Sequence, residues 1–161
     1  DKVFILDGGL KKWKMENKST SSDINEIKIS SYKAKENKTM VKDKNEIEIN
    51  INSKEFELID ARSKDRFDGT TPDPRKNVRS GSIPNSRCLP FKKLINDDHT
   101  FKSKSEISSY FKDLAIDNDT NIVFSCGSGI TACVLALAYS QVNNKYLPVI
   151  YDGSWAEYGR I

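Results

Sequence analysis

The segment that covers residues 122–142 constrains the fold more than any other part of the chain. Residues 122–125 form an apolar run of the length of a buried strand, and residues 130–142 are rich in Ala and Leu and predict a helix. Only Cys126 and a Gly-Ser-Gly turn separate the two. A buried strand that passes directly into a helix is typical of α/β proteins, so the sequence predicts an α/β domain with a mostly parallel sheet.

Several other segments fit the same architecture. Residues 56–61 and 149–151 are strand candidates, and the polar stretch 69–90 predicts a long loop because it is dense in Gly, Pro, Ser and Asn. The Ser-Lys-Ser-Glu sequence at 103–106 has the pattern of a capping box and precedes apolar residues at helical spacing. Residues 47–51 alternate apolar and polar side chains and allow either a half-buried strand or a short helix.

The two ends of the chain resemble each other. Residues 3–6 form an apolar run, expected to be a buried strand, before Asp7-Gly8, and residues 149–151 precede Asp152-Gly153 in the same way. Aligning these dipeptides also places Trp13 on Tyr158, which indicates a duplicated domain. Only the final segment of the first copy would be present in this sequence. The polar residues 14–26, which directly follow the first copy, predict an exposed linker.

Composition excludes several classes of protein. Among the 161 residues, 26 Lys and Arg stand against 23 Asp and Glu, and this near balance argues against a dedicated nucleic-acid binder. Three cysteines without a CxxC pair argue against a disulfide scaffold or zinc ribbon, and a single histidine, His99, excludes a His-rich metal site. No apolar run reaches the length of a membrane span, and we expect no signal peptide, metal or cofactor.

Cys126 is the predicted reactive residue. In a parallel α/β domain it would lie at the carboxyl end of a strand, where ligands bind. Gly127 and Gly129 allow several backbone N–H groups to turn inward, and these groups and the start of the next helix would stabilise an anion. A thiol in that place should have a lowered pKa and be nucleophilic, and a buried structural cysteine is the alternative.

Spacing argues against three other uses of this loop. A cysteine-dependent phosphatase needs an arginine six positions after the cysteine, where this chain has Ala132. A Walker loop needs a final Gly-Lys-Ser or Gly-Lys-Thr, and a papain-like protease needs a partner histidine. His99 lies in a polar stretch and is expected to be a solvated surface residue. Cys133 is expected to be a packed core thiol, with a resolving cysteine as the alternative, and Cys88 receives no role.

Several ordered motifs together resemble the second domain of tandem rhodanese sulfurtransferases. They are Asp60-Ala61-Arg62, Asp65-Arg66-Phe67, Pro72-Asp73-Pro74-Arg75, Ile83-Pro84, the Cys126 loop and Asp152-Gly153-Ser154-Trp155. The resemblance implies a rhodanese-like domain, with a central sheet of about five strands flanked by helices on both faces. It implies the tail of a first rhodanese domain at residues 1–13, a linker at 14–29 and the second, catalytic domain at 30–161.

The same resemblance implies a set of site residues. The loop Cys126-Gly-Ser-Gly-Ile-Thr matches the mercaptopyruvate sulfurtransferase class except for Ile130, whereas thiosulfate sulfurtransferases carry cations at this place. Arg66 and Arg75 match the arginines that bind the substrate carboxylate, although surface pairing with neighbouring Asp residues is the alternative for both. Ser128 resembles a serine that relays a proton. Gly127, Gly129, Ile130 and Thr131 would complete the substrate-binding loop, and Arg62 is expected to brace the end of a strand.

The function implied is transfer of sulfur from 3-mercaptopyruvate through a Cys126 persulfide to thioredoxin, a small thiol or cyanide. The alternatives are a thiosulfate sulfurtransferase, a persulfide relay fed by another protein and a non-enzymatic rhodanese-like module. A first rhodanese domain of the same chain is an expected partner, and neither nucleic acid nor membrane is. A cytoplasmic or mitochondrial location is expected.

Overall fold

A five-stranded parallel sheet lies at the centre of the protein in the computed structural model, which describes residues 3–24 and 26–161. The spatial order is β1 (Val41–Lys42), β5 (Ile150–Tyr151), β4 (Ile122–Ser125), β2 (Glu57–Asp60) and β3 (Arg87–Cys88). All four pairings are parallel, so the carboxyl ends of the strands meet at one edge of the sheet. The predicted α/β fold is confirmed.

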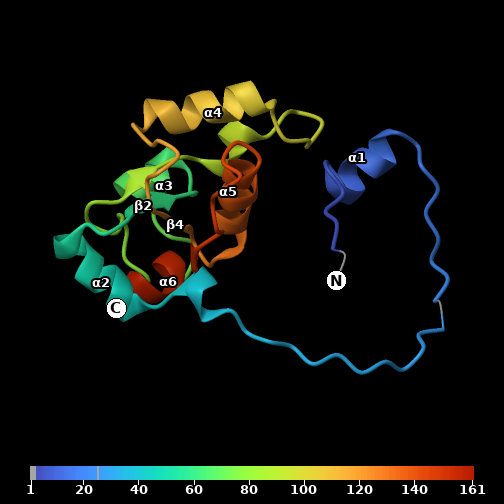
Figure 1. The fold of residues 1–161 in the computed structure, drawn as a ribbon, viewed down its shortest axis with the longest axis horizontal. Helices are drawn as coiled ribbons and strands as arrows, with labels where there is room; N and C mark the ends of the chain where they lie inside the picture. The colour runs from blue at the N-terminus through green and yellow to red at the C-terminus, as the bar shows by residue number, and fades with distance from the viewer. Residues whose placement is uncertain (1–2, 25) are drawn as a thin grey trace.

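Helices cover both faces of the sheet, as expected. One face packs against α4 (Lys104–Asp113), α5 (Ile130–Ser140) and the 3-10 turn η2 (Phe91–Leu94), and the other packs against α2 (Lys44–Ser53) and α6 (Ser154–Tyr158). Figure 1 shows the sheet between these two groups. In β4 the side chain of Phe124 enters the first cluster and that of Val123 the second, because successive residues of a strand point to opposite faces.

Local signals set the ends of the main helices. Ser103 accepts a hydrogen bond from the Glu106 N–H while Glu106 accepts one from the Ser103 N–H, so the predicted capping box is formed. Asp43 and Glu46 form a second capping box, which starts α2 and resolves residues 47–51 as helix. The predicted loop 69–90 follows the short helix α3 (Lys64–Asp68) and ends in β3.

The N-terminal part of the chain lies away from the sheet in Figure 1. It contains α1 (Gly9–Met15), whereas the 3-10 turn η1 (Lys38–Met40) runs directly into β1 of the sheet. Polar contacts join α1 and the residues before it to the domain: the Phe101 N–H donates to Asp7 at 2.9 Å, and Lys12 pairs with Asp98 at 2.6 Å. The prediction of a buried strand at residues 3–6 was wrong, because these side chains are 58–86% exposed and no described strand pairs with this segment.

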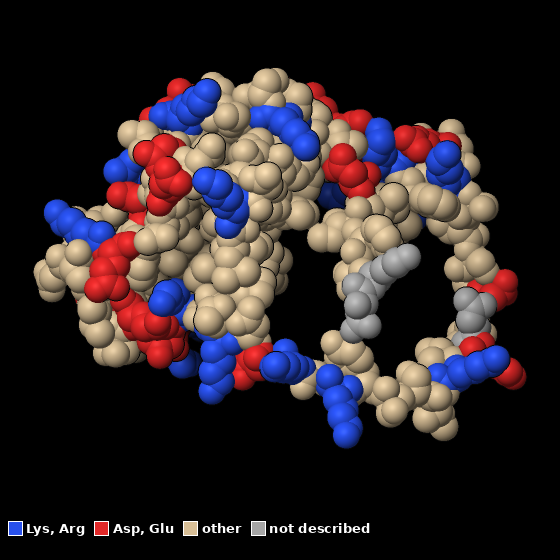
Figure 2. Space-filling view, viewed as in Figure 1, with Lys and Arg blue, Asp and Glu red and all other residues tan. Residues whose placement is uncertain are grey.

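Charged side chains of both signs are interspersed on the face drawn in Figure 2. On that face they make no continuous basic band of the kind that tracks a nucleic-acid backbone. Among the helices of the described residues, none has the length and apolar character needed to cross a bilayer.

Candidate active site

Cys126 lies at the carboxyl end of β4, and its side chain is 2% exposed. The Ser154 hydroxyl at the start of α6 accepts hydrogen bonds from the N–H groups of Cys126 and Gly129, at 3.0 and 3.1 Å. It donates in turn to the Tyr151 carbonyl at 2.8 Å. Trp155 N–H donates to the Cys126 carbonyl at 3.0 Å. The loop is therefore fixed at both of its ends by β5 and α6.

Two glycines shape this loop in different ways. Gly129 has a φ of 78°, and a Cβ there would lie 2.6 Å from the Asp152 carboxylate and 2.9 Å from its carbonyl, so a side chain is excluded. At Gly127 a Cβ would meet guanidinium nitrogens, with Arg75 at 3.2 Å and Arg66 at 3.4 Å. The missing side chain at Gly127 thus lets both arginines approach the cysteine loop.

Hydrogen bonds favour the thiolate of Cys126. Burial opposes ionisation, but the Thr131 hydroxyl and the backbone N–H groups of Ser128, Ala132 and Thr131 hydrogen-bond to the sulfur and lower the pKa of Cys126 below its ordinary value. These donors lie in the loop and the first turn of α5, where the positive end of the helix dipole adds to the effect. These donors stabilise an anionic sulfur, so the thiolate does not depend on a basic side chain beside Cys126.

Arg66 and Arg75 meet at a single buried carboxylate. Arg66 Nη2 lies 2.6 Å from Asp73 and Arg75 Nη1 3.2 Å, while the Asp73 side chain is 1% exposed. Burial opposes ionisation of Asp73, but bonds from the Arg75 N–H and the two guanidinium groups hold its pKa below the ordinary value. The anticipated Asp pairing is therefore real for both arginines, yet it orients them toward the cysteine loop rather than outward.

One cavity of about 380 Å³ brings these groups together. Its lining comprises Arg62, Ser63, Arg66, Arg75, Phe91, Lys92, Cys126, Gly127, Ser128, Ile130 and Thr131. All eight site residues expected from the sequence lie at this cavity or, for Gly129, in its loop. Ser128 and Ile130 are exposed at it, and Ile130 is 75% exposed.

Arg62 has the bracing role expected of it. It forms a buried ion pair with Asp60 at 2.8 Å, donates to the Gly81 carbonyl at 2.8 Å and stacks on Trp155 with 4.7 Å between the guanidinium carbon and the ring centre. These contacts tie the end of β2 to the long loop and to α6. Because Asp60 neutralises the charge of Arg62, this arginine adds little positive charge to the cavity.

The expectation that Cys133 packs in the core was wrong. It is exposed on α5 and bonds weakly to the Gly129 carbonyl at 3.4 Å, because the buried face of this helix is formed by Ala132, Leu135 and Tyr139. His99 is exposed, as expected, and all three cysteines are free. Within the described residues no group of His, Cys, Asp and Glu is arranged to hold a metal ion.

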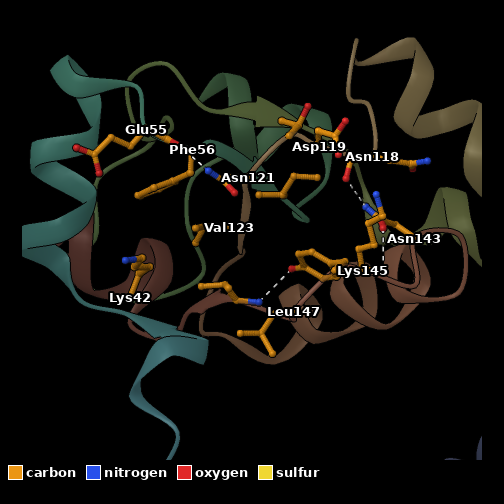
Figure 3. Close-up of a pocket in the computed structure, with 14 residues that line it drawn as sticks. Lys42, Glu55, Phe56, Asn118, Asp119, Asn121, Val123, Asn143, Lys145 and Leu147 are labelled. Carbon is orange, nitrogen blue, oxygen red and sulfur yellow. Dashed lines mark hydrogen bonds between the residues drawn. The ribbon is translucent and has the colours of Figure 1, made fainter.

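A larger cavity of about 430 Å³ lies at the opposite edge of the sheet (Figure 3). Phe56, Asn121 and Val149, each of which precedes a strand, contribute to its lining. Its polar groups are mostly surface amides and Lys or acidic side chains, and its lining holds no cysteine. Cys126, the predicted reactive residue, lines the smaller cavity, which is therefore the candidate active site.

Sequence reasoning missed two residues at the site and left one unresolved. Asp73 was one of several neighbouring aspartates that could pair with the arginines, and the structure shows that it pairs with both. Ser154 was visible only as part of a motif, and Lys92 had no signal because a lysine in a polar stretch is ordinary. Ser154 acts through hydrogen bonds to a segment that is distant in the chain, and such a contact is visible only in the folded protein.

The family comparison agrees with this geometry, since the family model described as "Rhodanese-like domain" matches residues 43–160. The chain belongs to the rhodanese family. Among curated relatives, the thiosulfate/3-mercaptopyruvate sulfurtransferase 1 of Arabidopsis thaliana is 34% identical over 98% of this chain and 47% of its own length. The human 3-mercaptopyruvate sulfurtransferase is 35% identical over 97% of this chain and 52% of its own length.

Solved structures agree as well. A rhodanese-fold 3-mercaptopyruvate sulfotransferase from Escherichia coli superimposes with a TM-score of 0.80 at 28% identity, covering 96% of this chain and 57% of that one. The chain spans about half the length of the curated relatives it matches.

Proposed function

We propose that this rhodanese domain transfers sulfur from 3-mercaptopyruvate to a thiol acceptor through a persulfide on Cys126. The observation that carries the proposal is the juxtaposition of a hydrogen-bonded, buried cysteine with Arg66 and Arg75 at one cavity. The names of the relatives support the reaction class, because they include both 3-mercaptopyruvate and thiosulfate sulfurtransferases.

The negative charge of the sulfur donor determines which side chains bind it. Guanidinium groups bind carboxylates with paired N–H donors, so Arg66 and Arg75 are assigned to the carboxylate and the ketone oxygen of mercaptopyruvate. Both have Nη atoms close to Gly127, next to Cys126. The donor thiol is thereby directed toward the cysteine loop, and Ile130 and Thr131 bound the remaining space.

The first half-reaction is a nucleophilic displacement at sulfur. The Cys126 thiolate attacks the donor sulfur, the donor's C–S bond breaks, and its electron pair leaves as the enolate of pyruvate. A proton on carbon completes pyruvate, and Ser128 is assigned to relay that proton. The Cys126 persulfide remains, and the N–H groups that favour the thiolate also stabilise the anionic persulfide.

In the second half-reaction an acceptor thiolate or cyanide attacks the outer sulfur and releases the Cys126 thiolate. Thioredoxin and small thiols are the proposed acceptors, since the reaction needs an accessible sulfur nucleophile. A free nucleophilic cysteine fits a reducing compartment, the cytoplasm or mitochondria. The Arabidopsis relative is named as mitochondrial.

A first rhodanese domain of the same chain is the proposed structural partner. The repeated pattern at Asp7-Gly8 and Asp152-Gly153 supports it, as do the exposed apolar side chains at residues 3–6. In this proposal residues 1–13 are the tail of that domain, residues 14–29 the linker and residues 30–161 the second domain.

Intact-mass analysis after incubation with 3-mercaptopyruvate tests the function. We expect the chain to gain one sulfur atom, reversed by a reductant, and the Cys126→Ser variant to gain none, while Cys133→Ser behaves as the unaltered chain. Loss of the gain in Cys133→Ser, or its persistence in Cys126→Ser, would contradict the assignment. The same assay with thiosulfate tests the second candidate, thiosulfate sulfur transfer. The cationic side chains that line the cavity support this candidate, because thiosulfate carries two negative charges.

A further inference from the structure

The cavity beside Cys126 is lined by four cationic side chains: Arg62, Arg66, Arg75 and Lys92. They differ in how much charge they leave for a ligand. Arg62 is neutralised by the buried Asp60 carboxylate. Arg66 and Arg75 share the single carboxylate of Asp73, so together they leave one positive charge, which matches one substrate carboxylate.

Lys92 is the cation without a counter-charge. In the described part of the chain no carboxylate lies within ion-pair distance of its ammonium group, whereas Lys12, Lys42 and Lys102 are each paired. Its backbone is fixed: the Phe91 N–H donates to the Ala61 carbonyl at 3.1 Å, and Leu94 of the same turn is fully buried. The structure therefore holds an unused positive charge at the cavity, on an element separate from the arginines.

Donors differ in the negative charge they bring. Mercaptopyruvate brings one charge to the Cys126 thiolate, whereas thiosulfate brings two. When the thiolate attacks the outer sulfur of thiosulfate, the S–S bond breaks and sulfite leaves with the electron pair and both negative charges. The cysteine loop supplies no cationic side chain to offset them, since its residues are Gly127, Ser128 and Gly129.

We propose that Lys92 is a donor-specificity residue, which supplies the second positive charge for a dianionic sulfane donor of the thiosulfate class at the Cys126 site. The proposal rests on the proposed function, because it assigns to one residue the binding of the thiosulfate donor at that same site. In this role the Lys92 ammonium group contacts the sulfonate end of the donor and the departing sulfite, where a positive charge stabilises the negative charge of the transition state. The single carboxylate of mercaptopyruvate binds to Arg66 and Arg75, so sulfur transfer from this donor depends little on Lys92.

Steady-state sulfur transfer to cyanide with each donor tests the proposal. We expect Lys92→Gln to lower kcat/KM for thiosulfate about three- to fivefold, the range of an exposed ion pair, and to leave kcat/KM for mercaptopyruvate within about twofold. Lys92→Arg should retain most of the thiosulfate activity. The matched control is Lys93→Gln, since Lys93 is exposed on the same turn but does not line the cavity. Equal losses with both donors, or no loss with thiosulfate, would overturn the proposal.

A second readout does not depend on sulfur transfer. Iodoacetate is an anion and iodoacetamide is neutral, so the ratio of their alkylation rates at Cys126 reports the local positive charge. We expect Lys92→Gln, but not Lys93→Gln, to lower this ratio, with a smaller difference at high salt. An unchanged ratio would reject Lys92 as a charge at the site. A chain that forms no persulfide with either donor would refute the proposed function, while the ratio would still decide the role of Lys92.

Discussion

The substitution Thr131→Val tests whether hydrogen bonds hold Cys126 as a thiolate. The Thr131 hydroxyl bonds to the Cys126 sulfur and opposes the effect of burial on its pKa. Valine has nearly the same size but donates no hydrogen bond. A hydrogen bond to a charged group contributes about 1.5–3 kcal/mol, and one pH unit corresponds to about 1.4 kcal/mol. The ionisation midpoint of Cys126 should therefore rise by about 1–2 pH units in the variant.

The assay is the pH dependence of Cys126 alkylation by iodoacetamide, followed by mass spectrometry of the peptide that contains it. Thr131→Ser is the matched control, because it retains the hydroxyl, and its midpoint should stay near that of the unaltered chain. Signal from the other cysteines is separated by peptide and by pH, since burial raises the pKa of Cys88 to about 11. A Thr131→Val midpoint equal to that of the unaltered chain, in a variant with an unchanged unfolding transition, would refute the argument.

Three further substitutions test the rest of the site. Arg66→Gln should raise KM for mercaptopyruvate about tenfold or more, because it removes charged hydrogen bonds to the carboxylate, and steady-state kinetics with an unchanged KM would reject that contact. Ser154→Ala leaves the buried N–H groups of Cys126 and Gly129 without an acceptor, and should lower the free energy of unfolding in urea by about 2–4 kcal/mol; a change near zero would contradict this. Asp73 is buried, but its bonds to the arginines keep its pKa below the ordinary value. The carboxylate therefore stabilises the fold fully above about pH 4, which is the pKa of an unfolded Asp side chain. This stabilisation is lost as the pH falls further. Asp73→Asn should therefore flatten the acid side of the stability profile in urea unfolding, and parallel profiles for the two proteins would contradict it.

The elements that the sequence predicted well depend on local signals. The capping box at Ser103 and Glu106 satisfies backbone groups only three residues apart, so its pattern is visible in one stretch of sequence. Strand β4 was predicted because its residues are apolar or small, and the structure shows all four of them buried. The strand expected at residues 3–6 failed for the opposite reason: a strand needs a neighbour, and none of the described strands lies beside it.

The same distinction applies to side-chain environments. Cys133 lies in an apolar stretch, but which side of a helix is buried depends on what packs against it, and α5 turns Cys133 outward. The resemblance to the family supplied Arg66 and Arg75 residue by residue, and pairing with a neighbouring aspartate was the alternative for both. Only the folded loop shows that the two arginines share one aspartate, Asp73.

The sequence by itself predicted the α/β architecture, the proposed nucleophile Cys126 and the glycines of its loop, because each follows from residues that are adjacent or regularly spaced. Tertiary structure decided the rest: that Ser154 fixes the loop from 28 residues away, that Asp73 aligns two arginines, and that Lys92 is left unpaired at the cavity. These residues lie on α6, η2 and the long loop after α3, and only the packing of the sheet brings those segments to the end of β4.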